Sequence, residues 1–197
     1  MRKQTKVFIV GFTFLMVLTI VAGFTYLNKN KTDYYHADYP AYDSQTDMEN
    51  IADIIIEGRI LNSHIQTINT AHPIASKDPK ENPSKDGKVS KEEGDIVYTV
   101  SRVKVNEVFK GQNIKPGDII EVKQLGGTID KVTYKDEHTE HFKNEKEYVM
   151  FLRDFQDQNP YSLINPSQGY YEKTDNKYLS HKKNKVQLDI ESLKHKK

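Results

Sequence analysis

An uninterrupted apolar run from Val7 to Leu27, without one charged side chain, constrains this chain more than any other feature of its sequence. A helix rises about 1.5 Å per residue, so a run of roughly 20 residues reaches across the ~30 Å hydrocarbon core of a bilayer. A helix without a polar face has no side to turn to water, which argues against a buried helix of a soluble protein. The run therefore predicts a transmembrane anchor over residues 7–27.

The charges on either side of this run predict its orientation. Arg2, Lys3 and Lys6 precede it, and basic residues beside a first hydrophobic segment favour the cytoplasmic side. Acidic residues soon follow: Asp33, Asp38, Asp43, Asp47 and Glu49. We therefore expect residues 1–6 to be a cytoplasmic stub of a single-pass protein of the cell membrane, with an extracytoplasmic C-terminal domain.

A cleaved signal peptide is the alternative for the same segment. Val21-Ala22-Gly23 offers small residues at a plausible cleavage position, which would release a secreted domain that begins at Phe24. The apolar core of a signal peptide is usually about 7–15 residues, shorter than this run, so the retained anchor is favoured. Both interpretations place the rest of the chain outside the cytoplasm.

The absence of cysteine limits both the fold and the chemistry of the exported part. Without disulfides the fold must rest on packing alone, and thiolate catalysis and Cys-based zinc sites are excluded. The formal net charge is +1, from 29 basic and 28 acidic residues. This balance lacks the basic excess of nucleic-acid-binding proteins, so we expect no nucleic-acid partner.

Short β-rich segments separated by turn signals dominate the chain after a polar tether over residues 28–45, in which Tyr34, Tyr35, Tyr39 and Tyr42 are interleaved among acidic residues. A Thr46-x-x-Glu49 spacing predicts a capped short helix, with Met48, Ile51 and Ala52 on one face. Strands are expected at Asp53–Leu61, Ile96–Phe109, Ile119–Gln124, Glu147–Leu152, Tyr161–Ile164 and Gly169–Glu172. Gly58 within the first strand indicates a bulge or bend, and a change of phase in the second indicates a bulge near Ser101-Arg102. The strand Glu147–Leu152 is apolar in both phases, which predicts a central position.

Two segments lack the strand pattern. Residues 62–95 contain a stretch dense in charge, proline and glycine, which favours a mobile loop. Residues 176–197 form a basic C-terminal tail in which Asp189–Leu193 is expected to begin a short helix. The lysines of this tail would contact anionic lipid or wall polymers, or act as solubilising charges.

Several short strings resemble a group of exported bacterial domains that are similar to the OB barrel of tissue inhibitors of metalloproteinases and netrin-like modules. They span about Thr46 to Glu172 and comprise Ala52–Gly58, Val105, Val108–Gly111, Gly117-Asp118, Gly126-Gly127, Glu147–Leu152, Tyr161 and Gly169. The resemblance implies a mainly β fold, in which the anchor is followed by a small antiparallel OB-like barrel over residues 46–175 with one or two short helices. Those inhibitors chelate their target's zinc through an N-terminal cysteine, which this chain lacks, so protease inhibition is not carried over.

His138 and His141 are the candidate metal ligands, because Glu137-His138-Thr139-Glu140-His141 gathers two imidazoles and two carboxylates. Such groups bind zinc or another divalent cation. The spacing matches no metalloprotease motif, and the surrounding charges are also typical of a solvated loop that binds nothing.

No nucleophile elbow or phosphate-binding loop is present, and Ser167 in Asn165-Pro166-Ser167-Gln168-Gly169 is interpreted as part of a turn. We therefore expect no enzyme and no cofactor. The predicted function is a membrane-anchored extracytoplasmic binding or interaction module. Its partners are the membrane, through residues 7–27, and an envelope protein or anionic wall polymer. The alternatives are a metal-dependent cell-envelope enzyme, acting through His138 and His141, and a secreted domain.

Overall fold

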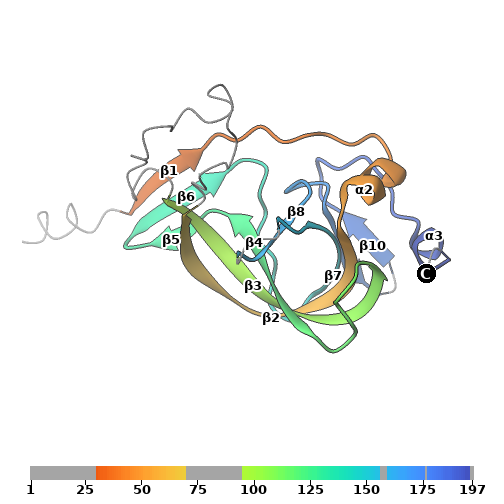
Figure 1. Ribbon diagram of the computed structural model, residues 1–197. Coiled ribbons are helices and arrows are strands. Elements are labelled where there is room, and N and C mark those ends of the chain that lie inside the picture. Colours follow the sequence, from red (N-terminus) through yellow and green to blue (C-terminus); the bar gives the residue numbers. More distant parts are fainter. Residues whose placement is uncertain (1–29, 70–94, 156–158, 176, 196–197) are drawn as a thin grey trace, which may run out of the picture.

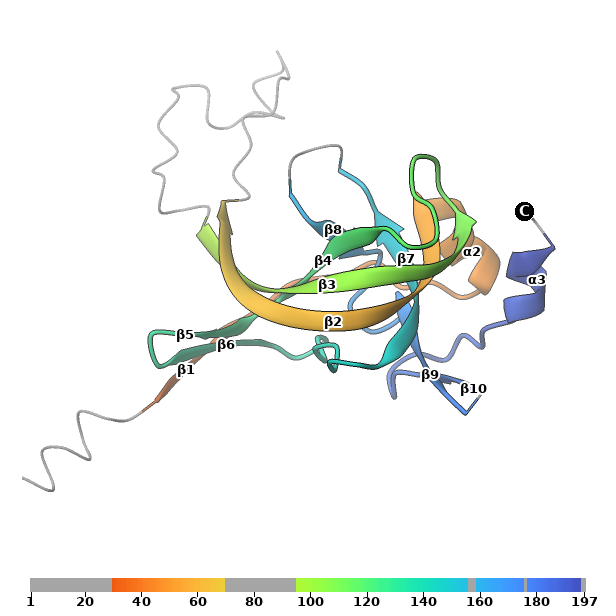
Figure 2. The ribbon, with the colours of Figure 1, turned by 90° about the horizontal axis from the view of Figure 1, so that it is seen from below.

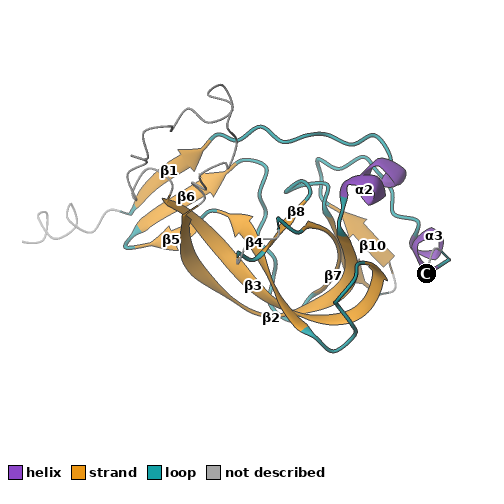
Figure 3. Ribbon diagram, viewed as in Figure 1, coloured by secondary structure: helices purple, strands orange, loops and turns teal. Residues whose placement is uncertain are grey.

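The computed structural model describes residues 30–69, 95–155, 159–175 and 177–195 as a mainly β fold with two short helices (Figure 3). The expected anchor over residues 7–27 lies outside these ranges, as does most of the expected loop over residues 62–95. Within the described ranges, no helix has both the length and the apolar character needed to span a bilayer.

One sheet of seven strands makes up most of the fold (Figure 1). Its order is β10-β9-β7-β2-β3-β4-β8, and β8 is also hydrogen-bonded to β7. The pairings therefore run in a circuit through β7, β2, β3, β4 and β8, with β9 and β10 added beside β7. All neighbours are antiparallel except β4 and β8, which are parallel. The strands are β2 (Ile54–Asn69), β3 (Asp95–Lys110), β4 (Ile119–Leu125), β7 (Glu147–Arg153), β8 (Tyr161–Leu163), β9 (Tyr170–Thr174) and β10 (Lys177–Ser180).

The strands β2 and β3 are long and strongly curved (Figure 2). Their register shifts at three places, between Ile55 and Ile56, between Glu57 and Gly58, and between Ile60 and Asn62. The expected irregularity at Gly58 is confirmed. The shift between Ile60 and Asn62 lies opposite the expected bulge, but its extra residue is Leu61 on β2. Such bulges increase twist and bend a strand, which accounts for the curvature.

A second sheet of three strands lies at one end of the molecule (Figure 1). It contains β1 (Lys31–Tyr35), β6 (Val132–Asp136) and β5 (Gly127–Ile129), in the order β1-β6-β5. The strand β1 falls inside the segment expected to be a tether. That expectation is wrong for these residues because a parallel ladder with β6 satisfies their backbone groups.

Two apolar clusters cover the two faces of the strands β2 and β7. Ile54, Ile56 and Ile60 belong to one cluster with Val103, Val105, Val122, Met150 and Leu152. Ile55 belongs to the other, with Val149, Phe151 and Tyr171, and this cluster includes Met48 and Leu193 from the two helices. Because β7 is buried on both faces, its predicted central position is confirmed.

The helix α2 (Gln45–Ile51) corrects two expectations, whereas α3 (Ile190–Lys194) agrees with its prediction. The N-cap of α2 is Ser44, whose hydroxyl accepts from the Asp47 N–H at 3.2 Å, rather than Thr46. Met48 and Ala52 are buried as expected, but Ile51 is 41% exposed. The predicted C-terminal helix is confirmed, with Asp189 as its N-cap.

Two segments in which no strand was expected contain strands. Residues 62–69 continue β2, because each of them pairs with a residue of β3. The sequence pattern did not indicate this pairing. The tail contains β10 and α3, and Val186 and Leu193 are buried. Val186 and Leu193 pack against the core with Leu188 and Ile190 beside them, while Lys182, Lys183 and Lys185 face solvent.

Candidate binding site

Residues 36–43, between β1 and the N-cap of α2, form an extended segment that we call the strap (Figure 1). It crosses the fold from the three-stranded sheet to α2. Asn165 Nδ2 donates to the Pro40 carbonyl at 2.8 Å. The Tyr42 N–H donates to Gln168 Oε1 at 2.9 Å, and Gln168 Nε2 donates back to the Tyr42 carbonyl at 2.8 Å. The side chains of Asn165 and Gln168 therefore make the hydrogen bonds to the strap backbone that a neighbouring strand would otherwise make.

The turn that carries these two side chains is held by its own hydrogen bonds. Asn165 Oδ1 accepts from the Ser167 N–H, the Ser167 hydroxyl and the Gln168 N–H. A Cβ at Gly169 would lie 2.6 Å from the Asn165 carbonyl oxygen, so the turn closes only with glycine there. The interpretation of Ser167 as a turn residue is confirmed, because its hydroxyl is used within the turn.

On one side of the strap lies a pocket of about 1000 Å³, which we call the aromatic groove. The strap, β3, β4 and the end of β7 form its walls. Five aromatic residues line it: Tyr35, Tyr39, Tyr42, Tyr98 and Phe155. Phe155 is 61% exposed and Ile51, which also lines the groove, is 41% exposed. Large apolar side chains are thus open to a ligand at its rim.

The charged residues that line the aromatic groove are basic. Lys123 is buried, and its Nζ lies 5.7 Å from the ring centroid of Tyr98 and 5.9 Å from that of Phe155. Arg153 is paired with Asp53 at 3.2 Å. Among the described residues that line the groove, none is acidic. The groove therefore combines ring faces with positive charge.

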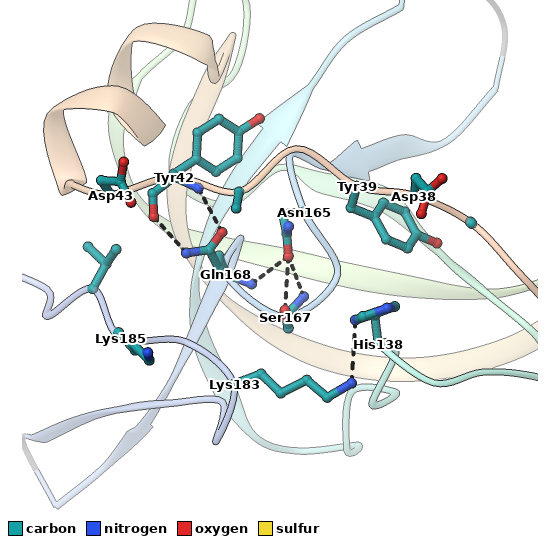
Figure 4. A pocket seen from close by; sticks show the side chains of 13 residues that line it. Asp38, Tyr39, Tyr42, Asp43, His138, Asn165, Ser167, Gln168, Lys183 and Lys185 are labelled. Atoms are coloured by element: carbon teal, nitrogen blue, oxygen red, sulfur yellow. Dashed lines mark hydrogen bonds between the residues drawn. The ribbon is translucent and has the colours of Figure 1, made fainter.

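On the other side of the strap lies a pocket of about 620 Å³, which we call the polar pocket (Figure 4). Asp38 and Asp43 lie along its strap side, and Lys183, Lys185 and His138 lie along the opposite side. The turn residues Asn165, Ser167 and Gln168 lie between them. The two sides thus carry opposite charge.

The side chain of Tyr39 belongs to both pockets. Burial, followed by the nearby carboxylate of Asp136, raises its pKa to about 12. Its ring meets that of His138 edge to face, with centroids 5.8 Å apart. Ala37 and Tyr42 also line both pockets. A single extended chain therefore separates the polar pocket from the aromatic groove.

Asp136, which lies near Tyr39, has one carboxylate oxygen without a hydrogen-bond partner among the described residues. Its Oδ1 accepts from the His138 N–H at 3.0 Å and from the Thr139 hydroxyl at 2.9 Å. Its Oδ2 is the buried side-chain atom without a hydrogen-bond partner among the described residues. The bonded oxygen orders the start of the loop that carries both candidate metal ligands.

The two histidines singled out in the sequence line different pockets. His138 lines the polar pocket, where Lys183 Nζ lies 3.4 Å from its Nδ1 and Glu137 lies 3.5 Å from its Nε2. His141 lines a smaller pocket of about 240 Å³, and its Nε2 lies 3.0 Å from the Leu125 carbonyl. In the described part of the chain, no three His, Asp or Glu side chains come together as a metal site would require. Metal binding by this pair stays a prediction.

The sequence indicated part of this region and missed the rest. Of the four tyrosines in the expected tether, Tyr35, Tyr39 and Tyr42 line the groove, whereas Tyr34 is 63% exposed. Lys123 and Phe155 were missed, because nothing in the local sequence places a lysine of β4 between two rings from other elements.

Comparison of the chain with protein-family models, curated proteins and solved structures gave no match.

Proposed function

We infer that this chain is a membrane-anchored extracytoplasmic binding module, and that the aromatic groove is its binding site. The observation that carries the inference is the groove itself, a space of about 1000 Å³ with five aromatic residues on its walls. Ligand pockets are concave and mostly apolar, with a few polar groups that orient the ligand. The groove meets that description, and its rim exposes Phe155 and Ile51.

An OB-like barrel is the architecture we propose for the strand circuit. It is supported by the hydrogen bonds of β8 to both β4 and β7, which link five strands in a ring of pairings. OB barrels bind oligosaccharides and oligonucleotides on the face of their second and third strands. In a circuit that begins at β2 these are β3 and β4, which supply Tyr98 and Lys123 to the groove.

The ligand class that the groove fits is an anionic sugar polymer of the cell envelope. Aromatic faces pack against the apolar faces of sugar rings, and Lys123 supplies positive charge between two of them. A nucleic acid would offer the same combination, but the expected location outside the membrane disfavours it. An envelope protein is the other partner class, and the test below separates it from a glycan.

Titration of the full chain in detergent micelles with two matched sugars tests this proposal. A hyaluronan tetrasaccharide carries carboxylates, whereas chitotetraose has rings of the same size without charge. We expect the hyaluronan tetrasaccharide to bind more tightly, and we expect added salt to weaken it.

Variants locate the binding. Tyr98→Ala and Phe155→Ala should each weaken binding by about 1 kcal/mol or more, since each removes a stacking face. Tyr34→Ala is the matched control, because Tyr34 is exposed outside the groove. An affinity that is unchanged in Tyr98→Ala and Phe155→Ala would reject the glycan and leave a protein partner as the ligand class. No binding of either sugar would do the same.

A further inference from the structure

We propose that the polar pocket is a second binding site, and that it takes a small zwitterion, a molecule with an ammonium group and a carboxylate a few bonds apart. The proposal does not depend on the aromatic groove, because the strap separates the two spaces and the charged residues of one are not those of the other.

The strap side of the polar pocket offers carboxylates. Asp38 and Asp43 line it and are exposed to solvent. Within the described ranges neither carboxylate has an ion pair or a side-chain hydrogen bond, although many other surface charges of this domain are paired. Two acceptors for an ammonium group are therefore available along the strap.

The opposite side offers cations. Lys185 lines the pocket, and in the described part of the molecule its ammonium group makes no ion pair. Lys183 donates to the Glu137 carbonyl at 3.1 Å and lies 4.0 Å from the Glu137 carboxylate, so part of its charge is already compensated. Lys185 is thus the main partner for a carboxylate, with Lys183 beside it.

The separation of these charges selects for a dipolar ligand. No ion pair joins the strap carboxylates to Lys183 or Lys185, even though they line the same pocket on facing sides (Figure 4). A purely anionic ligand would meet Asp38 and Asp43, and a purely cationic one would meet Lys183 and Lys185. A zwitterion oriented across the pocket gains attraction at both ends and repulsion at neither.

The base of the pocket suits such a ligand because it is polar and ordered. Asn165, Ser167 and Gln168 are buried, and their hydrogen bonds with one another and with the strap hold them in place. A volume of about 620 Å³ accommodates a dipeptide. Preorganised walls reduce the ordering cost of binding, which matters for a ligand with few contacts.

A matched series of three probes tests the proposal on the full chain in detergent micelles, with binding followed by nuclear magnetic resonance. The dipeptide Ala-Ala carries both charges, its N-acetyl form only the carboxylate, and its C-terminal amide only the ammonium group. We expect Ala-Ala to bind with a dissociation constant on the order of 1 mM. Each blocked form should bind about two- to fivefold more weakly, which is the range for a single exposed ion pair.

Variants assign each charge to its wall. Asp43→Asn should weaken Ala-Ala binding and reduce the preference for Ala-Ala over its N-acetyl form, while the preference over the amide stays. Lys185→Gln should do the reverse. The groove variant Tyr98→Ala should leave all three affinities unchanged, so a failure of the glycan proposal would not affect this result.

Three outcomes would overturn the zwitterion site. The first is equal binding of Ala-Ala and both blocked forms, and the second is an absence of binding at any concentration that the titration reaches. The third is loss of binding in Tyr98→Ala with no effect of Asp43→Asn or Lys185→Gln, which would place the dipeptide in the aromatic groove.

Discussion

Tyr42 and Gln168 bond to each other twice, the backbone of the one to the side-chain amide of the other, at 2.9 Å and 2.8 Å. They lie 126 positions apart in the chain. This pair joins the strap to the turn after β8, and both residues line the polar pocket. The wall between the two candidate sites is therefore held by the Gln168 side chain together with that of Asn165, which bonds to the Pro40 carbonyl.

Replacing this glutamine should loosen the strap without unfolding the domain. Gln168→Ala leaves the Tyr42 N–H and carbonyl without partners, and an unmade hydrogen bond costs about 1–3 kcal/mol. We expect amide hydrogen exchange of Tyr42 to speed up by about tenfold or more. The Gly126 N–H, bonded to the Val97 carbonyl, is the internal control. Unchanged exchange at Tyr42 would show that other contacts hold the strap.

Breaking the ion pair between Glu57 and Lys173 should destabilise the whole domain. Glu57 is buried, and it accepts from Lys173 Nζ at 2.6 Å and from the Tyr178 hydroxyl at 2.8 Å. Lys173→Met leaves the carboxylate short of a partner, so urea unfolding should show a loss of about 1–3 kcal/mol.

An exposed pair serves as the control for that variant. Lys194 and Glu191 lie 2.9 Å apart on the surface of α3, and Lys194→Met should leave the urea midpoint unchanged. Equal effects of Lys173→Met and Lys194→Met would contradict the role assigned to burial.

The free energy of unfolding should fall as the pH rises above about 10. Burial raises the pKa of Tyr39 from 10.0 to about 12. The folded state therefore keeps a proton that the unfolded state releases, and the stability present below pH 10 is lost between the two values. The pKa of Lys173 is raised by its bond to Glu57 and acts in the same direction. Tyr39→Phe should flatten this decline in urea titrations at pH 9 to 12, whereas an identical decline in the variant would contradict the assignment.

Adding a side chain at Gly58 should destabilise the curved sheet. A Cβ there would lie 2.6 Å from Val103 Cγ1 and 3.0 Å from the Lys104 carbonyl oxygen. Gly58→Ala is expected to cost about 1–3 kcal/mol in urea unfolding, because overpacking forces neighbours to shift. The double variant with Val103→Ala should cost less than the sum of the two single changes. Strict additivity would mean that the contact with Val103 is not the cause.

Zinc should leave the melting temperature of the domain unchanged. His138 and His141 line separate pockets, and one ring nitrogen of His141 lies at hydrogen-bond distance from a backbone carbonyl. A ligand that binds only the folded state would raise the melting temperature. A rise with zinc that disappears in His138→Ala and in His141→Ala would confirm the metal site predicted from the sequence.

Local patterns in the sequence predicted most of the individual elements. Alternation over Ile119–Gln124 and the doubly apolar Glu147–Leu152 correspond to β4 and β7, and α3 begins within the expected segment Asp189–Leu193. These predictions succeed because side-chain period, turn residues and caps act over a few positions. The tyrosines of the strap and His138 were also noted in the sequence, but the sequence did not indicate that they line one pocket.

The tertiary structure alone decided how distant segments combine. The pairing of β1 with β6, the extension of β2 to Asn69 and the burial of Val186 in the tail each depend on a partner far away in the chain. The candidate sites arise in the same way, since Asp43 and Lys185 face one pocket from opposite ends of the domain sequence. Such contacts depend on long-range packing and loop closure, to which no local period corresponds.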